Sequence, residues 1–212
     1  MARTKSSGRW LQRHLNDPYV KQAQKDGYRS RSAYKLIELN DKDRFIRPGM
    51  RVMDLGSAPG GWSQVLSRLL GGKGWVLATD ILPMDPIRNV DFVQGDFTDE
   101  AVLKTLLERA GGEKFDLIVS DIAPNLTGID SADQASSMYF LELAVDTVRR
   151  TLKPGATFVA KMFQGSGSDA WLKDLRTSFQ KVSIRKPAAS RPESREVYVV
   201  AKGFKAQQEP TG

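Results

Sequence analysis

The stretch Val52-Met53-Asp54-Leu55-Gly56-Ser57-Ala58-Pro59-Gly60-Gly61-Trp62 joins three kinds of local structure. Its first residues are mostly apolar, as in a buried strand. The glycines and Pro59 that follow break the strand into a tight turn, and the residues from Gly61 onward are typical of a helix. A strand that runs through a glycine-rich turn into a helix predicts the first unit of a parallel α/β sheet, with a ligand held against the turn.

The same alternation of short apolar runs and amphipathic stretches continues to the end of the chain. It predicts an α/β fold with a seven-stranded, mostly parallel sheet, an antiparallel last strand and helices on both faces. The expected strands are residues 51–55, 75–79, 90–94, 115–120, 156–160, 182–185 and 197–201. The expected helices between them are residues 61–70, 99–109, 134–152 and 169–179, and Pro154 and Gly155 predict a loop over residues 151–155.

The sequence divides into three segments. Residues 1–50 form a basic extension with expected helices at 18–25, which starts at Pro18, and at 30–43. Residues 51–205 form the α/β domain, and residues 206–212 are expected to be a disordered tail.

The composition excludes several classes of protein. The 212 residues include no cysteine and one histidine, His14, so disulfides, thiolate metal sites and histidine clusters are excluded, and we expect no metal. A Ser-His-Asp hydrolase is disfavoured because His14 lies in a basic polar leader and no G-x-S-x-G motif is present. No apolar run is long enough to span a membrane, and no signal peptide is visible. We therefore expect a cytoplasmic protein, with an organellar transit peptide as the minor alternative.

Charge is distributed unevenly along the chain. The net charge of +7 is made up of +8 in residues 1–51, −6 in residues 52–172 and +5 in residues 173–212. Two basic ends around an acidic centre indicate a polyanionic partner, although a solvated basic surface explains the total charge as well.

Acidic residues follow the first three strands of the predicted sheet. Asp54 ends the first, Asp80 the second and Asp96 follows the third, so their side chains should meet at one sheet edge. The turn has the spacing G-x-x-x-G-G rather than G-x-G-x-x-G, and Pro59 lacks the backbone N–H that a diphosphate would need. Three acids favour a ligand with a positive centre, such as a nucleoside whose ribose binds Asp80 and whose adenine amino group binds Asp96.

Two more polar residues follow the next core strands. Asp121 comes after residues 115–120 and Lys161 after residues 156–160. The motif after Asp121 is Ile-Ala-Pro-Asn rather than the Asn/Asp-Pro-Pro-Tyr/Phe of many amide and base methylases, and no cysteine nucleophile is available. A lysine at the end of a core strand, in the crevice where such folds bind ligands, indicates chemistry there.

These motifs resemble those of known methyltransferases. Asp54 to Gly60 is similar to the first S-adenosylmethionine-binding motif of Rossmann-like methyltransferases. The ordered set Lys35, Asp121, Lys161 and Glu196 resembles the K-D-K-E tetrad of RNA ribose 2′-O-methyltransferases. With Ser194 to Val199 included, the resemblance covers nearly the whole chain and is closest to the bacterial RrmJ/FtsJ (RlmE) family.

The resemblance implies a function and a set of site residues. It implies S-adenosylmethionine-dependent methylation of a uridine ribose in 23S rRNA of the 50S subunit, with Lys161 as general base, by a monomer. Asp121 would orient the base and the methyl donor, while Lys35 and Glu196 would position the ribose. The implied cofactor-binding residues are Asp54, Gly56, Gly60, Gly61, Trp62, Asp80, Asp96 and Asp121.

Basic residues near the tetrad predict the RNA-binding surface. Those closest to it in sequence are Arg29, Arg31, Arg191 and Arg195, and aromatic residues such as Trp10 and Tyr28 are interleaved with other N-terminal cations. Transfer RNA and messenger RNA caps remain alternative substrates. A nicotinamide-dependent oxidoreductase and a non-catalytic RNA-binding protein are the alternatives from other classes.

Overall fold

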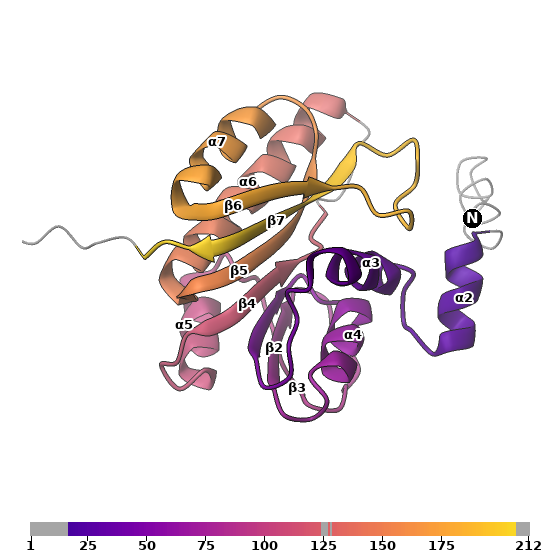
Figure 1. Cartoon of the computed structure of the whole chain (residues 1–212), viewed down its shortest axis with the longest axis vertical. Coiled ribbons are helices and arrows are strands. Elements are labelled where there is room, and N and C mark those ends of the chain that lie inside the picture. Colours follow the sequence, from indigo (N-terminus) through magenta and orange to yellow (C-terminus); the bar gives the residue numbers. More distant parts are fainter. Residues whose placement is uncertain (1–16, 124–126, 128, 207–212) are drawn as a thin grey trace, which may run out of the picture.

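A central sheet forms the middle of the molecule (Figure 1). The computed structural model describes residues 17–123, 127 and 129–206. The strands are β1 (Arg51–Leu55), β2 (Trp75–Asp80), β3 (Val90–Gln94), β4 (Phe115–Ser120), β5 (Leu152–Phe163), β6 (Phe179–Arg185) and β7 (Glu196–Phe204). The helices are α2 (Pro18–Asp26), α3 (Ala33–Asp43), α4 (Gly61–Leu69), α5 (Glu100–Arg109), α6 (Asp130–Thr151) and α7 (Ser168–Ser178). His14, Trp10, Pro124, Asn125 and the tail after residue 206 lie outside the described residues.

The strand order is β3-β2-β1-β4-β5-β7-β6. Strands β1 to β5 are parallel to one another, and β7 is antiparallel to both β5 and β6. The expected α/β fold with a mostly parallel sheet and an antiparallel last strand is therefore confirmed. From β1 the chain adds β2 and β3 toward one edge of the sheet, and then adds β4 and β5 on the other side of β1. Such a switch point in strand order, here between β1 and β4, opens a crevice at the carboxyl ends of the strands.

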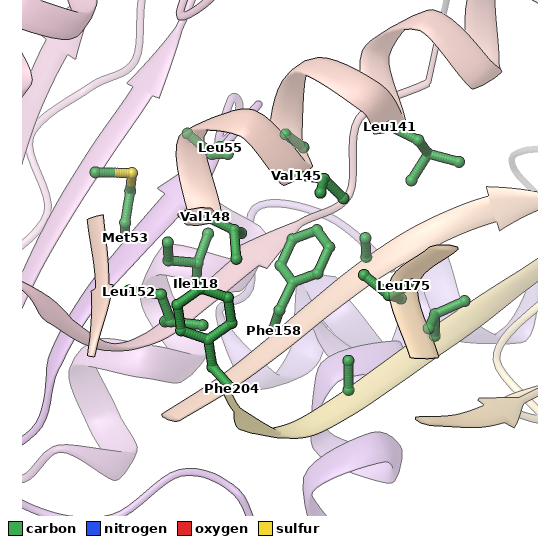
Figure 2. Packing of buried hydrophobic residues seen from close by; sticks show 14 of the residues in the cluster. Met53, Leu55, Ile118, Leu141, Val145, Val148, Leu152, Phe158, Leu175 and Phe204 are labelled. Carbon is green, nitrogen blue, oxygen red and sulfur yellow. The ribbon is translucent and has the colours of Figure 1, made fainter. Parts of the chain in front are cut away.

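Helices cover both faces of the sheet (Figure 1). On one face α5, α6 and α7 bury a large apolar cluster that includes Met53, Ile118 and Phe158 from the strands, seen in Figure 2. On the other face α3 and α4 pack on Val52, Val119 and neighbouring strand residues. Along central strands such as β4 and β7, successive residues belong to one cluster and then the other, because successive side chains in a strand point to opposite faces.

The two N-terminal helices are attached differently. Helix α3 packs on the sheet through Leu36 and Leu39, both of which are buried. Helix α2 begins at Pro18, and its first turn is capped by the Asp17 carboxylate, which accepts a hydrogen bond from the Tyr19 N–H at 3.0 Å. It lies beside the body of the molecule and next to the loop between β6 and β7 (Figure 1).

The structure moves several of the expected boundaries, and two starts, those of β5 and α6, move by four residues. Of the loop expected at residues 151–155, Thr151 ends α6 and residues 152–155 belong to β5. Leu152 pairs with Phe115 and is buried in the core, while the ladder shifts register between Phe115 and Leu117. A β-strand with a bulge thus accommodates Pro154 and the positive φ of Gly155. Helix α6 begins at Asp130, four residues before the expected start, and its first residue is preceded by Ile129, which offers no capping side chain.

Within the described ranges, no helix is long and apolar enough to cross a membrane. The same ranges contain no group of three His, Asp or Glu side chains placed to hold a metal ion.

Candidate active site

Strand register brings the four tetrad residues to one face of the sheet. Lys161 lies directly opposite Tyr198 in the antiparallel pairing of β5 and β7. Glu196 comes two residues before Tyr198 in β7 and therefore lies on the same face of the sheet. Asp121 follows β4, which runs parallel to β5. Helix α3 covers this face and contributes Lys35. Residues that are far apart in sequence therefore meet where four elements converge.

Lys161 is held by Asp121. Its Nζ donates a hydrogen bond to the backbone oxygen of Asp121 at 2.7 Å and lies 3.2 Å from the carboxylate Oδ1. The hydroxyl of Tyr198 donates to the same Oδ1 at 2.6 Å. The Lys161 side chain is only 7% exposed, so its amine is fixed rather than free in solvent.

Lys35 and Glu196 form the second ion pair of the tetrad. The two charged atoms, Lys35 Nζ and Glu196 Oε1, are 2.6 Å apart, and both side chains are nearly buried. Burial alone would raise the pKa of Glu196. The Lys35 ammonium, with smaller effects from Ser190 and Lys161, more than offsets this and holds that pKa below its usual range.

The tetrad opens onto a cavity of about 400 Å³. Three tetrad members line it, and the fourth, Asp121, contacts one of these three, Lys161. Cationic side chains outnumber carboxylates on its walls, which suits a ligand that carries phosphate. The lining residues are Arg31, Lys35, Ala123, Lys161, Phe163, Arg191, Glu193, Ser194 and Glu196.

A second cleft of about 340 Å³ lies at the carboxyl ends of β1 to β4. It contains three predicted acids, Asp80, Asp96 and Asp121, together with Gly56. Its other walls are mostly apolar, including the exposed side chains of Ile81 and Leu82. Ala123 lines both this cleft and the tetrad cavity, so the two hollows are adjacent.

Asp54 lies buried behind this cleft. One of its carboxylate oxygens accepts a hydrogen bond from Ser63 at 2.6 Å, whereas Oδ1 has no hydrogen-bond partner within the described part of the chain. Burial raises the pKa of Asp54 to about 7, and the nearby charges of Asp121 and Asp80 add to this effect against the Ser63 hydrogen bond. Among the described residues this buried carboxylate forms no ion pair and lies next to two more acids, which fits a positively charged ligand.

Gly60, Gly61 and Trp62, the other cofactor residues predicted in this segment, are not among the residues that line the cleft. A Cβ added at Gly60 would meet Ile87 at 2.6 Å, and one added at Gly61 would meet the Ser30 hydroxyl at 2.4 Å. Trp62 is buried under α3, donates a hydrogen bond to the Ser32 oxygen at 2.9 Å and packs against Tyr198. These three predicted cofactor residues support the turn from behind and do not line the cleft.

The four predicted RNA-binding arginines occupy different positions. Arg31 and Arg191 line the tetrad cavity, and each forms an ion pair with Asp17. Arg195 is half exposed and pairs with Asp130 at 3.4 Å. Arg29 differs from the others because, within the described part of the chain, its guanidinium forms no ion pair and donates hydrogen bonds to the backbone oxygens of Pro59, Asp85 and Pro86.

A profile of FtsJ-like methyltransferases matches residues 28–204. The chain belongs to the FtsJ-like methyltransferase family. The matched segment contains every tetrad residue and every acid of the cofactor cleft. The resemblance in the sequence motifs is thus confirmed at the level of the family.

Relatives of this FtsJ-like methyltransferase match it along nearly their whole length. Ribosomal RNA large subunit methyltransferase E of Stutzerimonas stutzeri is 68% identical over 97% of this chain and 100% of its own. The protein of the same name from Marinobacter nauticus is 59% identical, over 97% and 99% of the two chains. A solved structure from Plasmodium falciparum, described as a candidate ribosomal RNA methyltransferase, superposes with a TM-score of 0.78 at 33% identity and covers 85% of this chain and 100% of its own.

Sequence reasoning missed several residues of this FtsJ-like site. Tyr198 lies two residues after Glu196 in the same strand, so strand alternation alone would have placed it beside the tetrad. Ile81 and Leu82 directly follow Asp80, but nothing in the sequence distinguishes a cleft wall from an ordinary apolar loop. Phe140 reaches the cleft from α6 and has no sequence signal of its own.

Proposed function

We propose that this protein is an S-adenosylmethionine-dependent ribose 2′-O-methyltransferase that modifies a uridine of 23S rRNA in the large ribosomal subunit. The observation that carries the proposal is the adjacency of two hollows. One contains the Lys161–Asp121 and Lys35–Glu196 pairs, and the other is lined by acids and apolar side chains. A methyl donor in the second would face an acceptor nucleotide in the first.

The residues of the acidic cleft fit S-adenosylmethionine. Asp80 holds the cleft together, since its two oxygens accept hydrogen bonds from the N–H groups of Ala58 and Leu82 at 2.9 and 2.8 Å and retain lone pairs for ribose hydroxyls. Asp96 is exposed at the other end of the cleft, where it can accept from an adenine amino group. The unpartnered Oδ1 of Asp54 supplies negative charge close to Asp80 and Asp121, which suits the positive centre of this cofactor.

The chain's own side chains supply the remaining chemistry. When bound, S-adenosylmethionine supplies a methyl group whose transfer to the ribose oxygen leaves the bonding electron pair on sulfur. Lys161 takes the proton from the 2′-hydroxyl as general base and passes it to solvent. Asp121 orients that amine through its backbone and carboxylate oxygens. Lys35 and Glu196 form a fixed polar wall that positions the ribose.

The substrate assignment rests on the relatives and on charge. The two bacterial proteins cited above are named large-subunit ribosomal RNA methyltransferases and match 97% of this chain. The cations Arg31 and Arg191 line the tetrad cavity, where they can contact the phosphates of an RNA strand, and Arg195 lies nearby. We propose that the enzyme acts as a cytoplasmic monomer.

Transfer of a labelled methyl group tests this function. Large ribosomal subunits from a strain that lacks the protein are incubated with purified enzyme and labelled S-adenosylmethionine, and the product is mapped by alkaline hydrolysis. Methylation of a ribose makes its 3′ phosphodiester resistant to alkali, so one resistant dinucleotide with uridine on its 5′ side is expected. Label on a base, or transfer only to transfer RNA or capped messenger RNA, would refute the assignment.

A further inference from the structure

The guanidinium of Arg29 joins two loops that are distant in sequence. One nitrogen donates hydrogen bonds to the backbone oxygens of Pro59 at 3.2 Å and Asp85 at 2.7 Å. The other terminal nitrogen donates to the backbone oxygen of Pro86 at 2.9 Å. Arg29 therefore connects the glycine-rich loop, residues 56–60, to the loop that follows β2, residues 81–89.

Both loops line the acidic cleft. Gly56 and Ala58 of the first and Ile81 and Leu82 of the second line it. On the inner side, Asp80 bridges the same loops through the N–H groups of Ala58 and Leu82. Arg29 makes a second bridge between the two loops, through Pro59, Asp85 and Pro86, which do not line the cleft. The two loops are thus held together by a carboxylate in the cleft and by a guanidinium outside its lining.

Arg29 is itself held in place by α4. Its backbone N–H donates to the side-chain oxygen of Gln64 at 2.7 Å, and the Gln64 amide nitrogen donates to the Gly27 oxygen at 3.0 Å. The next residue, Ser30, packs so closely on Gly61 that a Cβ at Gly61 would lie 2.4 Å from its hydroxyl. The segment that carries Arg29 is therefore a rigid support rather than a free basic arm.

We propose that Arg29 is a positioning residue for cofactor binding rather than a contact for RNA phosphates. Its planar set of N–H donors is directed at three carbonyl oxygens, a geometry that suits arginine and that one ammonium group reproduces only in part. Loss of this bridge would let the two loops separate and would weaken binding of the cofactor. The inference rests on the proposed function in that it takes S-adenosylmethionine as the ligand of the cleft.

Calorimetric titration of the full chain with S-adenosylmethionine tests the proposal. We expect Arg29→Gln to raise the Kd by about tenfold, and Arg29→Lys to raise it less, since hydrogen bonds from a charged group are among the stronger ones. Arg47→Gln is the matched control, because it removes the same charge from an exposed side chain that follows α3, and it should leave the Kd unchanged. The salt dependence of binding to 23S rRNA is measured with the same variants and should be equal in Arg29→Gln and Arg47→Gln.

A Kd within twofold of wild type in Arg29→Gln would overturn the proposal, and a reduced salt slope in that variant alone would identify Arg29 as a phosphate contact instead. If Arg29→Gln does not fold, the backbone hydrogen-exchange rates of residues 81–89 in Arg29→Lys are measured instead of the Kd of Arg29→Gln. Faster exchange there than in wild type is expected, and unchanged exchange contradicts the bridge. Wild-type protein that binds S-adenosylmethionine but methylates no ribosomal RNA would refute the proposed function and leave this inference standing.

Discussion

The hydroxyl of Tyr198 donates a 2.6 Å hydrogen bond to the same carboxylate oxygen of Asp121 that lies 3.2 Å from Lys161 Nζ. Complete burial, together with the charges of Asp121 and Glu196, raises the pKa of Tyr198 far above its usual value. The phenol therefore stays protonated and remains a donor at any pH at which the enzyme works. Asp121 is thus fixed from one side by a neutral group and from the other by the proposed base.

Replacement of Tyr198 by phenylalanine removes this donor and retains the ring against Trp62. We expect kcat for ribose methylation to fall about tenfold, because loss of a hydrogen bond to a charged group costs about 1.5 kcal/mol or more. The Kd for S-adenosylmethionine should change little. Tyr34→Phe is the control, since it removes a hydroxyl bonded to Asp26 at the surface. Equal kcat values for wild type and Tyr198→Phe would show that Lys161 alone orients Asp121.

Lys161→Ala should reduce kcat by about 10²–10⁴-fold, the usual contribution of a general base. Cofactor affinity should remain near wild type, because Lys161 lines the tetrad cavity and not the acidic cleft. Lys153→Ala provides a matched control on the same strand, where Lys153 pairs with Asp116 at the end of β5 remote from the site. Single-turnover methyl transfer measures the effect, and near-wild-type rates would exclude Lys161 as the base.

Much of this site was predictable because strand ends determine it. Asp80 ends β2, Asp96 and Asp121 follow β3 and β4, and Lys161 lies two residues before the end of β5. Parallel strands bring their carboxyl ends to one edge. The start of β5 was not predictable, because Pro154 and Gly155 signal a loop and only the pairing of Leu152 with Phe115 overrides it.

Side-chain direction was a second limit of sequence reasoning. Arg29 and Arg31 are two residues apart and equally basic, yet Arg29 points to backbone oxygens and Arg31 to the tetrad cavity. Local charge cannot distinguish the two, since the difference arises from contacts with loops more than twenty-five residues away. The same limit applies to Gly61 and Trp62, whose neighbours behind the turn come from the segment before α3.

Salt dependence should reveal the arginines that bind RNA. Each lost phosphate contact should reduce the slope of log K against log salt by about 0.7–0.9. We expect this for Arg191→Gln, because Arg191 lines the tetrad cavity, and for Arg195→Gln, which lies beside it. Arg176→Gln, on α7, is the control of equal charge. Filter binding to 23S rRNA between low and moderate salt measures the slope, and identical slopes in all variants would remove both residues from the RNA surface.

The Lys35–Glu196 pair should contribute strongly to stability. Glu196→Gln leaves the nearly buried Lys35 ammonium without its counter-charge, which typically costs about 3–5 kcal/mol. Because the pKa of Glu196 is lower in the folded protein, its contribution is complete above the ordinary value of 4.5 and is lost as pH falls through the folded pKa. The stability difference between wild type and Glu196→Gln should therefore shrink below pH 4.5. Urea unfolding at several pH values measures it, with the exposed Glu108→Gln as control. A difference independent of pH would contradict the ion pair.

Asp54→Asn should stabilise the ligand-free protein and weaken cofactor binding. A carboxyl whose folded pKa is raised from 3.8 to about 7 stabilises the fold most fully below pH 3.8 and loses that contribution as pH rises toward 7. The rise corresponds to about 4 kcal/mol, which is the upper limit for the gain expected from Asp54→Asn at pH 8. The asparagine oxygen can still accept the Ser63 hydrogen bond.

Urea unfolding at pH 5 and pH 8 tests this prediction, and Asp41→Asn, on the exposed surface of α3, controls for the change in charge. The gain should be larger at pH 8 than at pH 5, because the wild-type carboxyl is mostly charged only at the higher pH. In the same variant the Kd for S-adenosylmethionine should rise, since a negative charge beside Asp80 and Asp121 is lost. A variant that is less stable than wild type at pH 8 would mean that a partner other than the cofactor stabilises the charged Asp54 carboxylate. The charge of Asp54 would then not lower the stability of the ligand-free protein.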